Sequence, residues 1–124
     1  TALVALGDLA CIATFVVAGE ISHGVDPLGA PLYVGNTYAA FLLGWLLAAL
    51  LGGLYATDAW RSPRRVVLTT VPAWAGAALV AQALRTTTFF HGGAALTFYL
   101  VSVGVGLALL VPWRLAAGLL LADR

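Results

Sequence analysis

Residues 37–56 read TYAAFLLGWLLAALLGGLYA and contain no charged side chain. A helix needs ~20 mainly apolar residues to cross the hydrocarbon core of a bilayer, and this stretch has that length. A strand of a membrane barrel would alternate polar and apolar residues, whereas the run from Phe41 to Leu47 does not alternate. The stretch therefore predicts a transmembrane helix.

Three further stretches have the same apolar character. Residues 3–19 hold one charge, at Asp8, while residues 66–84 end before Arg85 and residues 95–113 end before Arg114. The connections between the four stretches are too short to form a domain of their own. The expected fold class is therefore all-α, an integral membrane bundle of four transmembrane helices that forms a single domain over residues 1–124. The expected spans are 3–19, 37–56, 66–84 and 95–113.

Composition leads to the same class of protein. Hydrophobic residues make up 62% of the chain and charged residues 9%, whereas a soluble domain carries ~25% charged residues. Disorder is excluded, because disordered chains combine low hydrophobicity with high net charge. The net charge of +1 gives no basis for binding nucleic acid, which needs a strongly basic surface. The lipid bilayer is thus the first partner that the sequence predicts.

The arginines are divided unequally between the two sides of such a bundle. The side that holds both termini and the second connection carries Arg61, Arg64, Arg65, Arg114 and Arg124. The opposite side carries only Arg85. Because positive residues favour the cytoplasmic side, we expect a multi-pass protein of the cell membrane with both termini in the cytoplasm. Tyr55, Trp60 and Trp113 are expected to anchor that side in the membrane interface.

Small residues recur every four positions along the second stretch. They are Ala40, Gly44, Ala48, Gly52 and Ala56. Residues four apart lie on one helix face, and small residues let membrane helices approach closely. This candidate helix-packing face has three interpretations: contact between helices of one chain, an interface between copies of the chain, or a chance product of an alanine-rich composition.

Ionisable residues within or beside the spans are the candidate polar sites. They are Asp8, Glu20, His23, Arg85 and Arg114. Asp8 and Arg114 are expected near one membrane face, and Glu20 and Arg85 near the other, so each face can hold one acid–base pair. The functional interpretation makes these pairs gates or a proton path. The structural interpretation makes them clamps between helices, or charges that reach interfacial water. The structural interpretation is favoured for the residues at helix ends. For Asp8 the functional and the structural interpretation both remain open.

The sequence contains no motif for catalysis. It shows no nucleophile–base pair, phosphate-binding loop or metal-ligand cluster, so no catalytic residue, metal site or cofactor is predicted. We do not expect the chain to be an enzyme. His23 and His91 are the only histidines, and neither lies at a spacing that is typical of a metal site.

Several short motifs, in order along the chain, suggest a family. They are Gly7-Asp8, Ser22-His23-Gly24, Gly44-Trp45, Trp74, Arg85 and Trp113-Arg114. In these features the chain resembles a prokaryotic family of small four-span membrane proteins of unknown function, frequent in halophilic archaea and actinobacteria. The resemblance covers nearly the whole chain. It implies a polytopic membrane protein and supplies no activity.

Two functions remain open at this stage. The first is a transporter or channel for a small solute or ion, acting as a homo-oligomer because four short helices make a thin bundle. The alternative is a non-catalytic accessory subunit that packs against a larger membrane protein complex. The first requires polar residues that converge inside the bundle. The second requires a long apolar or small-residue face that the chain's own helices leave uncovered.

Overall fold

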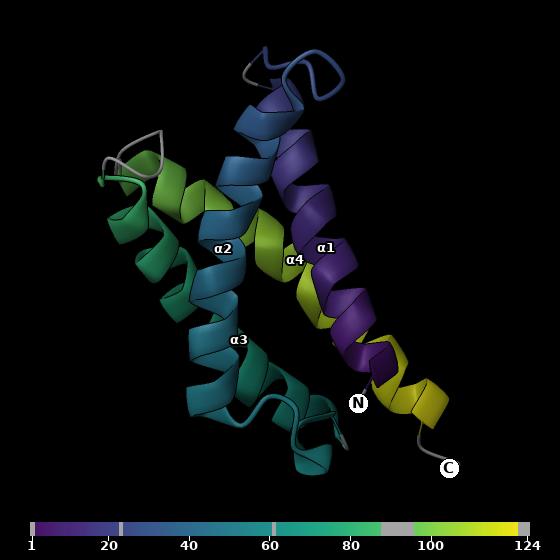
Figure 1. The fold of residues 1–124 in the computed structure, drawn as a ribbon. Coiled ribbons are helices and arrows are strands. Elements are labelled where there is room, and N and C mark those ends of the chain that lie inside the picture. Colours follow the sequence, from purple (N-terminus) through teal and green to yellow (C-terminus); the bar gives the residue numbers. More distant parts are fainter. Residues whose placement is uncertain (1, 23, 61, 88–95, 122–124) are drawn as a thin grey trace.

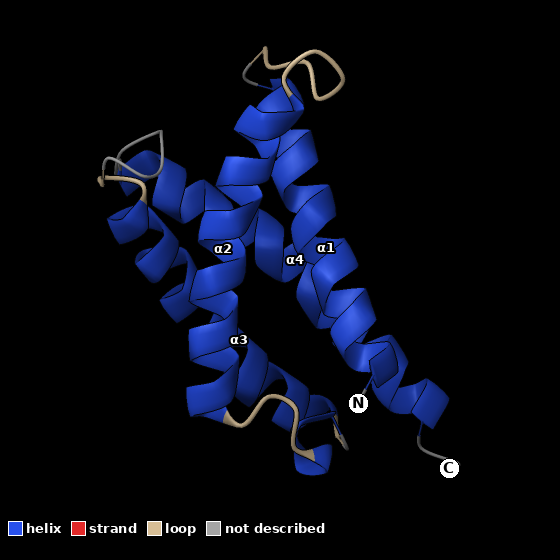
Figure 2. Ribbon diagram, in the orientation of Figure 1, coloured by secondary structure: helices blue, strands red, loops and turns tan. Residues whose placement is uncertain are grey.

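The computed structural model describes residues 2–22, 24–60, 62–87 and 96–121. Over these residues the chain forms four long helices, α1 (Ala2–Ser22), α2 (Pro31–Gly52), α3 (Pro63–Leu84) and α4 (Leu96–Leu121), and one short 3₁₀ helix, η1 (Thr57–Trp60). No strand occurs in this part of the chain (Figure 2). Each long helix is long and apolar enough to cross a membrane. The expected all-α membrane fold is confirmed.

The four helices form a closed ring of neighbours. α1 packs on α2, α2 on α3, α3 on α4 and α4 back on α1. In the described residues the backbones of α1 and α3, and those of α2 and α4, do not approach to a Cα–Cα distance of 8 Å, so only side chains meet across the ring. The contact between α2 and α3 is the most extensive, and that between α1 and α2 is the least. The start of α1, the α2–α3 connection and the end of α4 lie at the same end of the bundle (Figure 1). We call this the termini end, and the end that holds the α1–α2 connection the opposite end.

The bounds of the second helix differ from the expected span of 37–56. α2 begins six residues earlier because Pro31 occupies its first turn, where the missing N–H and the fixed φ of proline are tolerated. It ends four residues earlier because Gly53 adopts the left-handed conformation, with φ of 67°, and its N–H bonds to the Ala49 carbonyl. Glycine takes this conformation without steric cost, so it stops helices efficiently.

The fourth helix is longer than the expected span of 95–113. α4 runs through Pro112 and past Arg114 to Leu121 without a break. Its first described residue is Leu96, and residue 95 lies outside the described ranges. The continuation places Arg114 within the helix rather than at its end. This position determines which residues the guanidinium can reach.

Aromatic rings fill the middle of the bundle. Phe15, Phe41 and Trp74 contact one another with ring centroids 5.0 to 5.7 Å apart. Trp45 lies 6.3 Å from Trp74, and Phe98 lies 6.4 Å from Phe41. Rings from all four helices therefore close the space between the two ends of the bundle.

Candidate functional site

The central feature of the termini end is a buried ion pair between α1 and α4. Arg114 Nε donates to Asp8 Oδ1 at 3.0 Å, and Arg114 Nη2 donates to Asp8 Oδ2 at 2.6 Å. Both side chains have 0% of their surface exposed. This is the pair that the sequence predicts. Its two parallel bonds are the strong, orienting geometry that arginine forms with a carboxylate.

The α2–α3 connection takes part in the same cluster. Arg114 Nη1 donates to the Leu54 carbonyl at 3.0 Å, and the Tyr55 hydroxyl donates to Asp8 Oδ2 at 2.8 Å. Trp45 Nε1 in turn donates to the Tyr55 oxygen at 2.9 Å. Arg114 therefore joins α1, α4 and the connection, and we call these five residues, Asp8, Trp45, Leu54, Tyr55 and Arg114, the inner cluster.

Aromatic faces complete the surroundings of the guanidinium. The Arg114 guanidinium carbon lies 5.5 Å from the centroid of Trp45 and 5.3 Å from that of Tyr55. Such faces attract cations, most strongly where water is excluded. Burial, which is the largest cause, raises the pKa of Tyr55 to about 12. The phenol therefore remains a hydrogen-bond donor to Asp8 at all ordinary pH values.

The connection is folded onto the bundle rather than extended into solvent. Leu54, Ala59 and Trp60 are all buried, and η1 packs against α3 and α4. The Trp60 carbonyl lies so close to α4 that a Cβ atom at Gly118 would overlap it. Trp60 is thus not the interfacial anchor that the sequence suggests, and Tyr55 is bound to Asp8 instead of projecting outward.

A second polar group, the outer cluster, lies at the opposite end of the bundle. Glu20 is buried and accepts a hydrogen bond from Thr37 Oγ1 at 2.7 Å. Arg85, just beyond α3, approaches Gln82 Oε1 at 3.5 Å and lies 4.2 Å above the ring of Phe98. These residues, Glu20, Thr37, Gln82, Arg85 and Phe98, come from all four helices or their ends.

Electrostatics link the two charged members of the outer cluster. Burial lowers the pKa of Arg85, and the carboxylate of Glu20 acts in the opposite direction. Glu20 and Arg85 are therefore close enough to interact, as the sequence suggests. His23, the remaining candidate polar site, lies outside the described residues, as does His91. Among the residues that the structure describes, no group of three or more His, Cys, Asp or Glu side chains can hold a metal ion.

The small-residue face of α2 is divided between two environments. Ala40 and Gly44 are buried, and a Cβ atom at Gly44 would overlap the Ala77 carbonyl of α3. Ala48 is half-buried. Gly52 and Ala56 are exposed, because α2 ends at Gly52 and the chain turns away. The part of the face formed by Ala40 and Gly44 thus packs against another helix of the same chain.

One protein family matches nearly the whole length of this bundle. A family model described as a protein of unknown function (DUF3054) matches residues 5–117. The chain belongs to this family. No curated protein and no solved structure matches the chain.

The DUF3054 match contains both polar clusters and the motifs that the sequence suggested. In the structure, two of those motifs interlock. A side chain at Gly7 would overlap the ring of Trp113, while the next residues, Asp8 and Arg114, form the ion pair. The glycine therefore provides the space for the tryptophan, and the close approach of α1 and α4 brings the charges together.

The sequence did not predict two members of the inner cluster, or a further contact between α3 and α4. Tyr55 and Leu54 depend on the chain reversal at Gly53, which no periodicity reveals. Trp74 donates to the Ser102 carbonyl at 2.9 Å and occupies the space left by Gly106. The signal that could have found this contact is the pairing of a glycine on one span with a tryptophan on another.

Proposed function

We propose that this DUF3054 protein is a membrane transporter for a small ion or solute, and that the Asp8–Arg114 pair is its gate at the termini end. The observation that carries the proposal is the complete burial of this pair. Replacing a buried ion pair by apolar residues is often neutral or stabilising, so a purely structural bundle has no need of one. Ionisable groups inside membrane spans usually mark ion or substrate pathways.

The arrangement of the clusters supports a gated pathway rather than an open channel. The inner and outer clusters lie at opposite ends of the ring of helices, and aromatic rings fill the space between them. The bundle is closed in this conformation. Opening the termini end requires Arg114 to release Asp8 and the Leu54 carbonyl, which removes the hydrogen bonds by which Arg114 joins α4 to α1 and to the start of the α2–α3 connection. Opening the other end requires Glu20 and Arg85 to separate.

The test of the proposal is flux through the purified protein. The full chain is reconstituted in liposomes, and fluxes of protons, sodium, potassium and a panel of small organic solutes are measured against protein-free liposomes. We expect the protein to raise the flux of at least one of these probes, in a saturable manner for a solute. Fluxes equal to those of protein-free liposomes for every probe would contradict the proposal.

A second candidate function, the accessory subunit, is favoured by a specific feature of α4. Residues at four-residue intervals along this helix are all exposed, and three of the six are glycine or alanine: Leu100, Gly104, Ala108, Pro112, Ala116 and Leu120. A Cβ atom at Gly104 would meet nothing within 4 Å. Small residues favour close packing of membrane helices, so another helix can dock here.

Isolation from native membranes distinguishes the two candidates. A homo-oligomer in mild detergent, without a larger partner, supports the transporter. A stoichiometric larger membrane protein that is lost when Gly104 is replaced by Leu supports the accessory subunit. Gly35→Leu is the matched control, because Gly35 is also exposed with open space around it but lies on α2.

A further inference from the structure

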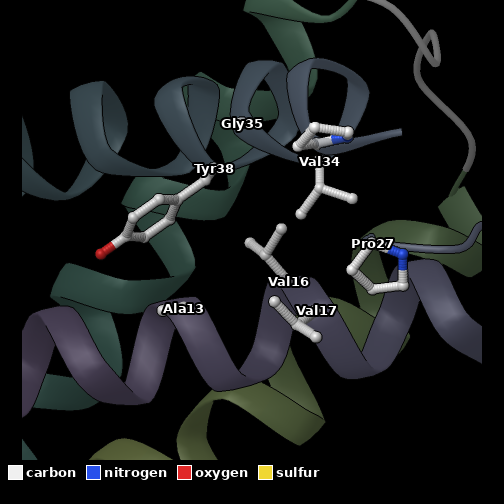
Figure 3. Close-up of a pocket in the computed structure, with 8 residues that line it drawn as sticks. Ala13, Val16, Val17, Pro27, Val34, Gly35 and Tyr38 are labelled. Atoms are coloured by element: carbon white, nitrogen blue, oxygen red, sulfur yellow. The ribbon is translucent and has the colours of Figure 1, made fainter. Parts of the chain in front are cut away.

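An apolar groove runs between α1 and α2, near the opposite end of the bundle (Figure 3). Its volume is about 230 Å³. Val16 of α1 and Val34 of α2 point toward one another across it, and Pro27 of the α1–α2 connection lies at one end. The full lining consists of Ala13, Val16, Val17, Pro27, Pro31, Val34, Gly35 and Tyr38. The groove lies at the least extensive of the helix contacts in the ring.

The lining offers little to water. Tyr38 has the only polar side chain among the lining residues, and its hydroxyl already donates to the Leu9 carbonyl at 2.9 Å. An ordered water needs about two to four polar partners, which this lining does not provide. The lining therefore favours an apolar occupant.

The shape of the groove selects a single chain. Its α2 wall runs from Pro31 to Tyr38, which at ~1.5 Å per residue is a length of about 10 Å. A volume of 230 Å³ over this length gives a cross-section of roughly 20 Å². A helix ~10 Å in diameter has a cross-section of about 80 Å², so the groove is too narrow to enclose a helix of another protein. It is wide enough for one extended hydrocarbon chain.

The groove is continuous with the surface that faces the bilayer. Pro31 and Gly35 at its margin are exposed, as are the neighbouring apolar side chains Leu32 and Ile21. Because the groove follows the α2 axis, a chain lying in it is parallel to α2, a membrane-spanning helix. The bilayer therefore supplies both the occupant and its orientation.

From this geometry we infer that the groove binds one acyl chain of a bilayer phospholipid and holds it between α1 and α2. The bound chain completes the packing that these two helices do not provide for each other. The site is independent of the inner cluster and of the transport proposal.

Photo-cross-linking tests the site directly. The full chain is reconstituted in phosphatidylcholine liposomes in which a fraction of the lipid carries a diazirine within one acyl chain. After illumination, modified peptides are mapped by mass spectrometry. Cross-links per residue are expected to be concentrated at residues 13–17 and 31–38, in excess of those on the exposed α4 residues Leu100, Val101, Gly104, Val105 and Ala108. Equal labelling of both regions would overturn the inference.

A variant in which a side chain fills the groove is the matched comparison for the wild type. Gly35→Phe places a ring at the groove margin, where an added Cβ meets nothing within 4 Å, so the fold is expected to persist. Labelling of residues 13–17 should fall by about tenfold, because the ring replaces the contacts of the chain. Gly104→Phe, at an equally open position on α4, should leave this labelling unchanged. Undiminished labelling in Gly35→Phe would also overturn the inference.

A second copy of the protein is the competing occupant. Gly35→Cys in a Cys11→Ala background is treated with a short bifunctional thiol reagent in liposomes, with Gly104→Cys as the comparison. A lipid-filled groove predicts no more dimer at position 35 than protein density in the membrane produces. Efficient, density-independent dimer formation at position 35 would assign the groove to another copy.

Discussion

Arg114 donates a hydrogen bond from each of its three side-chain nitrogens, with Nε and Nη2 on Asp8 and Nη1 on the Leu54 carbonyl. An arginine presents these donors in a rigid plane, which a lysine cannot reproduce. The side chain therefore fixes the distance between α1, α4 and the α2–α3 connection. Removing either charge leaves the other buried without its partner.

A double-mutant cycle measures the strength of this pair. Asp8→Asn and Arg114→Gln should each lower the free energy of unfolding in detergent by about 3–5 kcal/mol, because one buried charge is left unpaired. The double variant should lose less than the sum of the two. Asp26→Asn is the control, since Asp26 is exposed. Strict additivity would show that Asp8 and Arg114 do not act as a pair.

Tyr55 gives the inner cluster a dependence on alkaline pH. Its pKa rises from 10 in the unfolded chain to about 12 in the folded protein, so the folded state holds the phenolic proton more tightly. The stabilisation is complete below pH 10 and is lost as the pH rises toward 12. The unfolding free energy should therefore fall across this interval. Tyr55→Phe should remove that part of the fall, and an unchanged pH profile in the variant would exclude Tyr55 as its source.

The pairing of Asp8 with Arg114 could be predicted from sequence, because both charges lie near the same end of apolar spans. Lipid provides no partner for either charge, so each needs the other. The contacts of Tyr55 could not. They depend on a left-handed turn at Gly53 and on a connection folded against the bundle, and nothing in the local sequence gives the direction of that turn.

Among the elements, α2 and α3 form the closest pair because Gly44 faces the backbone of α3. A substituent there meets the Ala77 carbonyl, and backbone atoms cannot move aside as a flexible side chain can. Gly52, in contrast, faces only the Leu54 side chain and is exposed. Two members of one sequence pattern thus have different roles.

The close approach of α3 at Gly44 predicts that alanine is destabilising there but not at a glycine with open space around it. Gly44→Ala should lower the free energy of unfolding by about 1–3 kcal/mol, the usual cost of overpacking. Gly76→Ala, on α3 with open space at the added Cβ, should leave it unchanged or raise it slightly, because alanine favours helix. Unfolding by denaturant in micelles measures both. Equal stability of Gly44→Ala and the wild type would show that the two helices do not approach closely here.

The number of helices and their order could be predicted from hydrophobic length alone. Their bounds could not be predicted to the residue, since proline at a first turn and glycine at a left-handed position moved both ends of α2. The small-residue pattern identified a packing face, but only the structure shows where α2 ends and the contact ceases. Interactions between elements decide such limits, and a single stretch does not contain them.

At the scale of the whole molecule, the exposed arginines give an orientation to test. Arg64 and Arg65 are exposed at the termini end, and basic residues favour the cytoplasmic side. In a Cys11→Ala background, a cysteine at Pro63 should react with an impermeant thiol reagent only after membranes are opened. A cysteine at Leu28, which is 94% exposed, should react in intact cells. The reverse pattern of labelling would invert the proposed topology.

Flux through the Asp8→Asn variant shows whether the buried Asp8–Arg114 pair acts as a gate. Wild type, Asp8→Asn and the exposed-site control Asp26→Asn are reconstituted at equal density, and each is shown to be folded by circular dichroism. The flux of whichever probe the wild type transports is then compared. We expect Asp26→Asn to match the wild type and folded Asp8→Asn to lose the gated flux, either to the level of protein-free liposomes or to an unsaturable leak. Saturable flux in Asp8→Asn equal to that of the wild type would exclude a gate and leave the ion pair with a structural role alone.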